Sequence, residues 1–343
     1  MIGIGVIGCG RISQLRHIPE YAKNPEAELV GFCAMNSPAR AEAMAKQYGG
    51  KVYGTVEEML ADPKIQAVSV CTANATHAEL TIRALNAGKH VLCEKPMATT
   101  VAECEAMVEA AKRNGKFLMI AQNQRLDKVH LAAKKLLDEG LIGKVISFRT
   151  IFGHGGPETW SIEPGSGTWF FDKSRAVIGA MGDLGIHKTD LIQHLLGQRV
   201  VRVTAKLTTL DKCYADGTLI GVDDNAFCIY EMSGGAVGTM TASWSTYGGL
   251  DDSVVLYGTK GILRVYEDPE KPLQAMLADG TRMSWDVKPT PENSGIIDQW
   301  MECILQNKEP EISGESALQA MRAVLASVES SETGAAVEIP ENR

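Results

Sequence analysis

Short apolar runs alternate with helical patterns through the first third of the chain, and this alternation restricts the fold more than any other feature. Between the runs, segments such as Pro38–Tyr48 and Val101–Arg113 place apolar residues at the spacing of one helical face. Strands that are apolar almost throughout and separated by single helices are typical of a parallel sheet covered on both faces. The sequence therefore predicts a doubly wound α/β domain. The runs predicted as strands are Ile2–Ile7, Glu28–Ala34, Lys51–Tyr53, Ala67–Thr72, His90–Cys93 and Phe117–Ala121.

The pattern changes after Gln122, where strands of alternating polarity become dominant. Such strands predict a large, mostly antiparallel open-faced sheet with one side covered. The strands expected there are Val201–Leu207, Ala226–Met232, Ala236–Trp244, Val254–Tyr257 and Ile262–Tyr266. The expected helices are Leu131–Leu137, Asp183–Leu196 and Ser316–Ser331. At roughly 150 residues per domain, 343 residues indicate two α/β domains, 1–122 and 123–343.

Composition excludes several classes of function. The net charge of −8 opposes binding to a phosphate backbone, so nucleic acid is not an expected partner. No apolar run reaches the roughly 18–20 residues of a membrane helix. The eight cysteines form no CxxC pair, and the first residues resemble no secretory leader, so we expect a reducing, cytoplasmic environment.

A glycine-rich turn follows the first predicted strand directly and opens a helix. Gly8 permits the tight turn, and Gly10 lets the backbone of Arg11 and Ile12 approach a pyrophosphate at the helix N-terminus. Ser13 replaces the third glycine of the usual pattern and is small enough for close helix–strand packing. The motif indicates a dinucleotide site, and the alternative is an ordinary strand–helix turn.

The second predicted strand ends without the carboxylate that commonly binds the adenosine ribose. Met35 occupies that position, and Asn36, Ser37 and Arg40 follow it. These side chains suit either a ribose hydroxyl or a 2′-phosphate. The sequence therefore leaves NAD and NADP as alternatives.

Polar residues also follow the fourth, fifth and sixth predicted strands. The carboxyl ends of parallel strands are where open α/β sheets bind ligands. We therefore assign Thr72, Asn74, His77, Glu94, Lys95 and Gln122 to the cofactor site. The competing interpretations are helix capping for Thr72 or His77, and a solvated Lys–Glu pair in a turn forced by Pro96 for Glu94 and Lys95.

Asp183 and His187 lie four residues apart and share one helical face. The aspartate can fix the tautomer of the imidazole, which can then remove a hydroxyl proton as general base. Asp190 and His194 continue the helical spacing and raise a metal site as an alternative. No matching cluster elsewhere completes a metal shell, so we expect none. Trp160, in the loop His154–Thr168, and Trp169, directly after it, are candidates for aromatic surface against a sugar ring, or for core residues.

Three strings together resemble the Gfo/Idh/MocA family of oxidoreductases: GCGRIS, AGKHVLCEKP and GDLGIHKTD. The resemblance covers nearly the whole chain and implies a Rossmann domain followed by a domain with an open-faced sheet that forms homodimers or homotetramers. It implies that Lys95, Asp183 and His187 form the catalytic set, and that the Lys95–Pro96 peptide is cis. We also expect Lys95, Asp183 and His187, together with Trp160 and Trp169, to contact the substrate. Many relatives carry aspartate where this chain has Met35.

The expected function is NAD- or NADP-dependent hydride transfer to or from a hydroxyl or keto carbon of a sugar, polyol or glycoside. His187 would move the hydroxyl proton, Lys95 would stabilise the charge on that oxygen, and Asp183 would orient His187. Two alternatives remain. One is a glycoside-cleaving enzyme that keeps its NAD bound, and the other is a regulator that binds the dinucleotide without catalysis.

Overall fold

The computed structural model describes residues 1–288 and 293–340, and it divides into two compact units. The first unit comprises Met1–Gln122 together with Glu292–Leu318. The second comprises Asn123–Pro291 together with Gln319–Arg343. The boundary after Gln122 thus falls where the sequence pattern changes. The segment Glu292–Leu318, which comes later in the chain, also belongs to the first unit.

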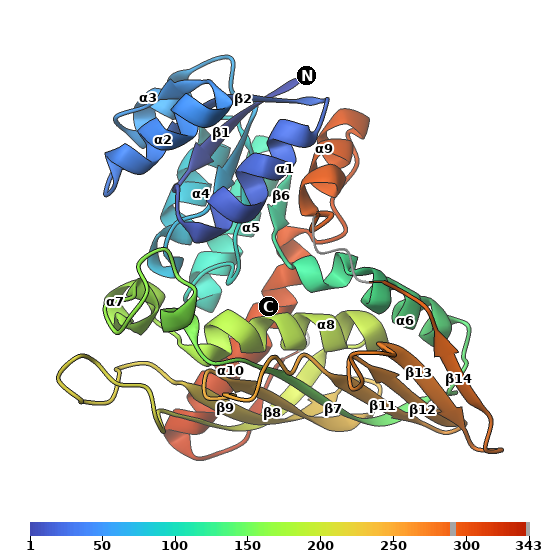
Figure 1. Cartoon of the computed structure of the whole chain (residues 1–343). Coiled ribbons are helices and arrows are strands. Elements are labelled where there is room, and N and C mark those ends of the chain that lie inside the picture. Colours follow the sequence, from blue (N-terminus) through green and yellow to red (C-terminus); the bar gives the residue numbers. More distant parts are fainter. Residues whose placement is uncertain (289–292, 341–343) are drawn as a thin grey trace. The chain divides into compact units, whose positions relative to one another are not determined.

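The first unit is built on a six-stranded parallel sheet in the order β3-β2-β1-β4-β5-β6 (Figure 1). The chain adds β2 and β3 on one side of β1, and then β4 to β6 on the other. The direction of winding therefore reverses between β1 and β4, which is where doubly wound sheets bind their ligands. The strands are β1 Ile2–Ile7, β2 Ala27–Cys33, β3 Lys51–Val52, β4 Ala67–Val70, β5 His90–Cys93 and β6 Leu118–Ile120.

Helices connect these strands, as the sequence predicted. The connection between β5 and β6 is typical: Thr100 and Glu103 form a capping box at its start, and Gly115 ends it in the left-handed conformation. The helices of this unit are η1 Ser13–His17, α1 Ile18–Lys23, α2 Pro38–Tyr48, α3 Val56–Ala61, η2 Asn74–Thr76, α4 His77–Asn86, α5 Val101–Asn114 and α9 Ile296–Gln306. Helix α9 was not predicted; it packs near α1, where Ser294 binds both carboxylate oxygens of Glu20 at 3.0 and 2.7 Å.

The second unit is built on a nine-stranded sheet in the order β14-β13-β12-β11-β7-β10-β9-β8-β15. Only β7 and β10 pair in parallel; the other pairs are antiparallel. The α/β fold class predicted from the sequence is therefore confirmed. The strands are β7 Val145–Gly153, β8 Val200–Thr208, β9 Asn225–Met232, β10 Val237–Ser243, β11 Val254–Gly258, β12 Gly261–Val265, β13 Leu273–Leu277, β14 Arg282–Trp285 and β15 Val337–Glu338.

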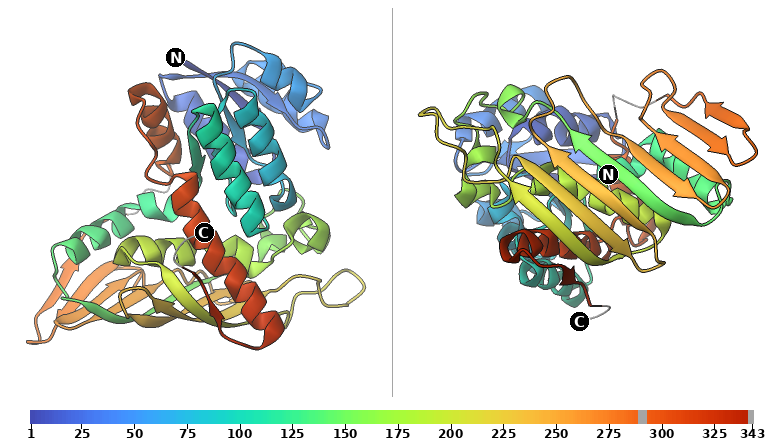
Figure 2. Two further views of the ribbon diagram at one scale, coloured as in Figure 1. Left: turned by 180° about the vertical axis from the view of Figure 1, so that it is seen from behind. Right: turned by 90° about the horizontal axis from the view of Figure 1, so that it is seen from below.

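One face of this sheet is covered, and the other is open. The helical segments η6 and α8 pack against β7 and β10 on the covered face. Seen from below in Figure 2, the strands lie in front with no helix across them. The helices of this unit are η3 Asn123–Leu126, α6 Lys128–Asp138, η4 Pro157–Thr159, η5 Trp169–Phe171, α7 Lys173–Ala176, η6 Met181–Gly185 and α8 Ile186–Leu196, and α10 Gly314–Thr333 joins the two units in sequence.

Several elements of the second unit differ from the sequence prediction. Strands β7, β13, β14 and β15 were not predicted. Strand β7 lies inside the sheet, yet Ile146 and Arg149 are exposed because they face the open side, which weakens its apolar pattern. The helix predicted from Asp183 begins earlier, as the π-helical segment η6, and becomes α-helical only at Ile186. Because a π-helix has more residues per turn than an α-helix, side chains four residues apart across this segment do not line up as they would on an α-helix.

Candidate active site

The glycine-rich turn begins directly after β1. Gly8 has a φ of 95°, and a Cβ there would lie 2.5 Å from the carbonyl oxygen of Cys71, so only glycine fits. A Cβ on Gly10 would have that same oxygen as its nearest neighbour, 3.9 Å away. Ser13 is buried and donates to the carbonyl of Gly10 at 2.9 Å. The turn thus leaves open space beside Gly10 at the start of a helix, as a pyrophosphate site requires.

The end of β2 forms a tight turn in which the Ser37 N–H donates to the Ala34 carbonyl at 2.9 Å. Met35 and Asn36 are exposed on this turn, and Ser37 is half-buried. Arg40 follows in the first turn of α2 and is also half-buried. The position that commonly holds a ribose-binding carboxylate is therefore an exposed thioether side chain.

The ends of β4 and β5 are tied together by His77. Its ring is fully buried, with Nδ1 2.8 Å from the Pro96 carbonyl and Nε2 3.1 Å from the Thr72 carbonyl. Burial lowers the pKa of His77, although its contacts with the Pro96 and Thr72 carbonyls oppose the shift. Both ring nitrogens face backbone oxygens, so His77 supports the turn around Lys95, and its assignment to the cofactor site stays a prediction. The Lys95–Pro96 peptide is cis, as expected.

Glu94 is held by a buried chain of polar side chains. Its Oε1 lies 2.8 Å from Nε2 of His17, whose Nδ1 lies 3.2 Å from the hydroxyl of Ser69. Its Oε2 accepts the backbone N–H of Lys95 at 3.1 Å. Burial raises the pKa of Glu94, but hydrogen bonding to His17 and the charge of Lys95 outweigh it, so the net pKa lies below its ordinary value. An ionised Glu94 thus fixes the backbone on which Lys95 stands.

Gln122 and Asn74 are further buried polar residues at this edge of the sheet. Gln122 is 1% exposed, and neither atom of its amide group has a hydrogen-bond partner among the described residues. A buried amide without partners costs free energy unless a ligand satisfies it. The carboxamide of a nicotinamide ring offers both a donor and an acceptor. Together with the open space at Gly10, this orphaned amide fits a bound nicotinamide dinucleotide.

In the second unit, Asp183 lies in η6 and His187 in the first turn of α8; both are buried. The Trp244 indole N–H, at the end of β10, donates to Asp183 Oδ2 at 3.1 Å. The start of this segment is fixed by Asp223, whose carboxylate accepts the N–H groups of Gly179 and Met181 at 2.8 and 2.7 Å. Burial raises the pKa of Asp223 to about 6, although those two donors oppose the shift.

The metal alternative receives no support from the geometry. Asp190 forms a buried ion pair with Arg125, with oxygen–nitrogen distances of 2.7 and 2.5 Å. That bidentate pairing occupies both carboxylate oxygens of Asp190, so they are not available to a metal ion. Over residues 1–288 and 293–340, no group of three or more His, Cys, Asp or Glu side chains is arranged to hold a metal ion.

Aromatic rings extend from His187 through the loop that precedes α7. We call this set the aromatic cluster: Phe152, His154, Trp160, Trp169, Phe170 and Trp244. The His187 ring lies 5.8 Å from Phe152, which lies 6.1 Å from His154. Ring contacts at 6.1, 5.2 and 4.0 Å then join His154 to Trp160, Trp160 to Phe170 and Phe170 to Trp169. Phe170 also contacts Trp244 at 6.4 Å, so the cluster leads from the imidazole back to the residue that binds Asp183.

Sequence reasoning found Trp160 and Trp169 but missed Trp244, Phe152 and His17. Trp244 ends a strand predicted as part of an ordinary sheet, and nothing in its neighbourhood marks a partner 61 residues earlier. Phe152 lies on the unpredicted strand β7. A signal for His17 existed, because a histidine beside apolar residues in the helix after the glycine turn is unusual, but only the fold reveals that Glu94 is its partner.

Replacing Trp244 with phenylalanine should lower turnover while keeping most of the ring packing. The change removes the indole donor from Asp183, and hydrogen bonds to charged groups contribute about 1.5–3 kcal/mol. We expect kcat to fall by about 10-fold or more if Asp183 must hold a fixed position. Steady-state kinetics check this, with Trp285→Phe on β14 as the control. Equal kinetics for both variants would show that the Trp244–Asp183 bond has no role in turnover.

Comparison with known proteins gives the chain its family. Residues 2–122 match the model described as an oxidoreductase family with an NAD-binding Rossmann fold. Residues 130–264 match the GFO/IDH/MocA C-terminal domain. No helix among the described residues is both long and apolar enough to span a membrane.

Individual relatives are sugar and polyol dehydrogenases. The levoglucosan dehydrogenase of Pseudarthrobacter phenanthrenivorans is 31% identical over 81% of this chain and 76% of its own length. The myo-inositol 2-dehydrogenase of Thermotoga maritima is 26% identical over 98% of both chains. A structure of levoglucosan dehydrogenase with NADH and levoglucosan superposes with a TM-score of 0.87, at 28% identity, over 99% of this chain and 100% of that one. The chain therefore belongs to the Gfo/Idh/MocA family of oxidoreductases, with an NAD-binding Rossmann fold.

Proposed function

We propose that this protein transfers a hydride between a nicotinamide dinucleotide and a hydroxyl-bearing carbon of a sugar or polyol. The observation that carries the proposal is the Asp183–His187 segment in the second unit. A buried carboxylate held by Trp244 stands four residues before a histidine that packs against the aromatic cluster. Aromatic faces next to an acid–base group suit a carbohydrate, which presents C–H faces and hydroxyl groups together.

In the proposed mechanism, His187 removes the proton of the substrate hydroxyl during oxidation and returns it during reduction. Asp183 orients the imidazole and stabilises its cation. The Lys95 ammonium stabilises the negative charge that develops on the same oxygen. When bound, the nicotinamide ring accepts or supplies the hydride. Trp160 and Trp169 contribute aromatic surface for the sugar ring.

The proposed cofactor residues divide by the part of the dinucleotide that they would face. The backbone at Gly8, Gly10, Arg11 and Ile12 is suited to the pyrophosphate. Asn36, Ser37 and Arg40 are suited to the adenosine ribose, or to a 2′-phosphate in NADP. Thr72, Asn74, Glu94, Lys95 and Gln122 are suited to the nicotinamide end. His77 supports the turn that carries Lys95 and stays a predicted residue of the cofactor site. The domains follow from this assignment: residues 1–122 bind the cofactor, and most of 123–343 binds the substrate.

A substrate screen tests the proposal. Purified protein is mixed with sugars, inositols and glycosides, with NAD and NADP in parallel, and the nicotinamide absorbance band is followed. Net reduction of one dinucleotide by at least one substrate is the expected result. Glycoside cleavage without added cofactor and without net absorbance change would instead indicate catalysis through tightly held NAD. Dinucleotide binding with no turnover across the panel would indicate a regulator.

We further propose that the open face of the large sheet pairs with a second copy of the chain. Large apolar side chains lie exposed on three neighbouring strands: Ile146 on β7, Val237 on β10, and Phe227 and Ile229 on β9. Exposed apolar residues grouped on one sheet face are typical of an interface. Sedimentation velocity should give the mass of a dimer or tetramer, and Phe227→Lys with Ile229→Lys should lower it. A monomeric wild-type protein would contradict the proposal.

We propose a cytoplasmic location on the basis of cysteine chemistry. All eight cysteines are unpaired, and seven of them are buried. Burial raises the pKa of thiols such as Cys71 and Cys93, which leaves them unreactive. Such cysteines suit a reducing compartment. Fractionation of the cells that produce the protein would test the location.

A further inference from the structure

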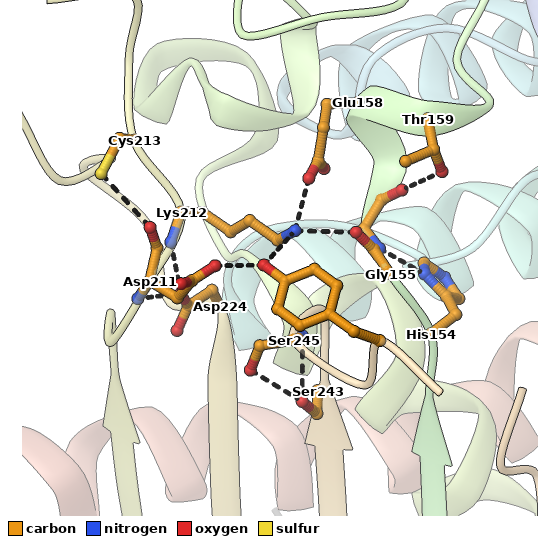
Figure 3. Close-up of polar contacts among 12 residues, drawn as sticks. His154, Gly155, Glu158, Thr159, Asp211, Lys212, Cys213, Asp224, Ser243 and Ser245 are labelled. Carbon is orange, nitrogen blue, oxygen red and sulfur yellow. Dashed lines mark hydrogen bonds and ion pairs between the residues drawn. The ribbon is translucent and has the colours of Figure 1, made fainter. Parts of the chain in front are cut away.

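A buried lysine joins three loops of the second unit beside the aromatic cluster (Figure 3). Lys212 lies in the loop between β8 and β9, and its side chain is 4% exposed. Its ammonium contacts the Glu158 carboxylate, donates to the Gly155 carbonyl at 2.7 Å, and donates to the Tyr247 hydroxyl at 3.0 Å. An ammonium group has three N–H donors, and these three acceptors use all of them.

The backbone around Lys212 is held by a buried carboxylate. Asp224 accepts the backbone N–H groups of Leu210, Asp211 and Lys212, each at 2.8 Å. The Tyr247 hydroxyl, which accepts from Lys212, in turn donates to the Asp211 carboxylate. Burial lowers the pKa of Lys212, but the hydrogen bonds and charge of its partners outweigh this, so the net pKa is raised and the ammonium stays charged.

The segment that Lys212 holds lies between two members of the aromatic cluster. Gly155 and Glu158 fall between His154 and Trp160 in the sequence, and the rings of His154 and Trp160 are 6.1 Å apart. The loop is closed locally where the Gly165 N–H donates to the Glu158 carbonyl at 2.8 Å. Trp160 itself is 37% exposed, so packing against neighbouring side chains is not enough to fix the position of its ring. The position of that ring therefore depends on the polar contacts of residues 155–158.

We propose that Lys212 is a positioning residue for substrate recognition, which holds the loop 154–168 so that His154 and Trp160 present their rings to a sugar. This deepens the proposed function and rests on it. Lys212 touches neither the acid–base pair nor the glycine turn through any contact described above. Its loss should therefore weaken sugar binding and leave dinucleotide binding and the chemical step nearly unchanged.

The test compares Lys212→Met with Lys135→Met, which removes a lysine that is 76% exposed on α6. For Lys212→Met we expect the KM for the sugar to rise by about 10-fold or more, because a broken buried ion pair frees the loop. The KM for the dinucleotide should change less than twofold, and kcat only a few-fold. Hydrogen exchange of the peptides that cover 154–168 should accelerate, and Lys135→Met should match wild type in every measurement.

Tyr247→Phe supplies a second variant in case Lys212→Met does not fold. It removes one acceptor of Lys212 and the donor to Asp211 but keeps the Lys212–Glu158 ion pair, so we expect a smaller change in the same direction. An unchanged sugar KM together with unchanged exchange of 154–168 would overturn the proposal, as would equal losses for sugar and dinucleotide. If wild-type protein turns over no sugar, the proposed function fails instead, and the exchange rates alone then decide whether Lys212 holds the loop.

Discussion

Lys95→Met is expected to abolish measurable turnover while the protein still binds its dinucleotide. Methionine retains most of the length of the side chain but removes the ammonium charge. Loss of one group that stabilises a developing oxyanion costs about 10²–10³-fold in kcat. Cofactor affinity should change little, because Lys95 is proposed to face only the nicotinamide end, whereas the pyrophosphate is proposed to bind the backbone of the glycine turn.

The surroundings of Lys95 explain why the effect should be confined to chemistry. The turn is held by His77 beneath Pro96 and by the Glu94 carboxylate, which accepts the Lys95 N–H. Both contacts use backbone groups and not the lysine side chain, so both can remain in Lys95→Met. Steady-state kinetics with saturating dinucleotide, together with a binding titration, check the expectation. Lys64→Met, at an exposed position before β4, is the control. Turnover like that of wild type in Lys95→Met would remove Lys95 from the mechanism.

Local patterns predicted the first unit well, because its elements depend on neighbours in the sequence. The turn at Gly8 requires a positive φ, and glycine is the residue that adopts it readily. Helix α5 carries its own start and stop signals at Thr100 and Gly115. Features of this kind leave their mark within a few residues, so a single sequence is enough to locate them.

The parts that escaped prediction depend on distant partners. His17 becomes significant only when β5 brings Glu94 within 2.8 Å of it. Trp244 becomes significant only when the end of β10 meets Asp183. Strand β7 was missed because one side faces the open surface, where polar and apolar residues are both tolerated. Long-range pairing of this kind has no local signature, and the support around Lys95 and Asp183 therefore had to come from the structure.

His187→Gln is expected to lower kcat by about 10²–10⁴-fold, the range that general acid–base catalysis contributes. The pH dependence should change as well. In the oxidation direction His187 must be unprotonated to accept a proton, so protonation at low pH should lower wild-type activity. In the reduction direction it must be protonated, so activity falls as the pH increases. Glutamine does not titrate, so the residual activity of His187→Gln should show neither the decrease at low pH in oxidation nor the decrease at high pH in reduction.

His194→Gln provides a control that also separates the acid–base mechanism from the metal alternative. His194 lies on the same helix, two turns beyond His187, and belongs to the set that raised a metal site in the sequence. If a metal ion were held by that set, both variants would lose activity, and a chelator would lower the activity of the wild-type protein in the same way. Under acid–base catalysis only His187→Gln should lose activity, because Asp190 is already paired with Arg125. Retention of both pH-dependent decreases in His187→Gln would mean that another group moves the proton.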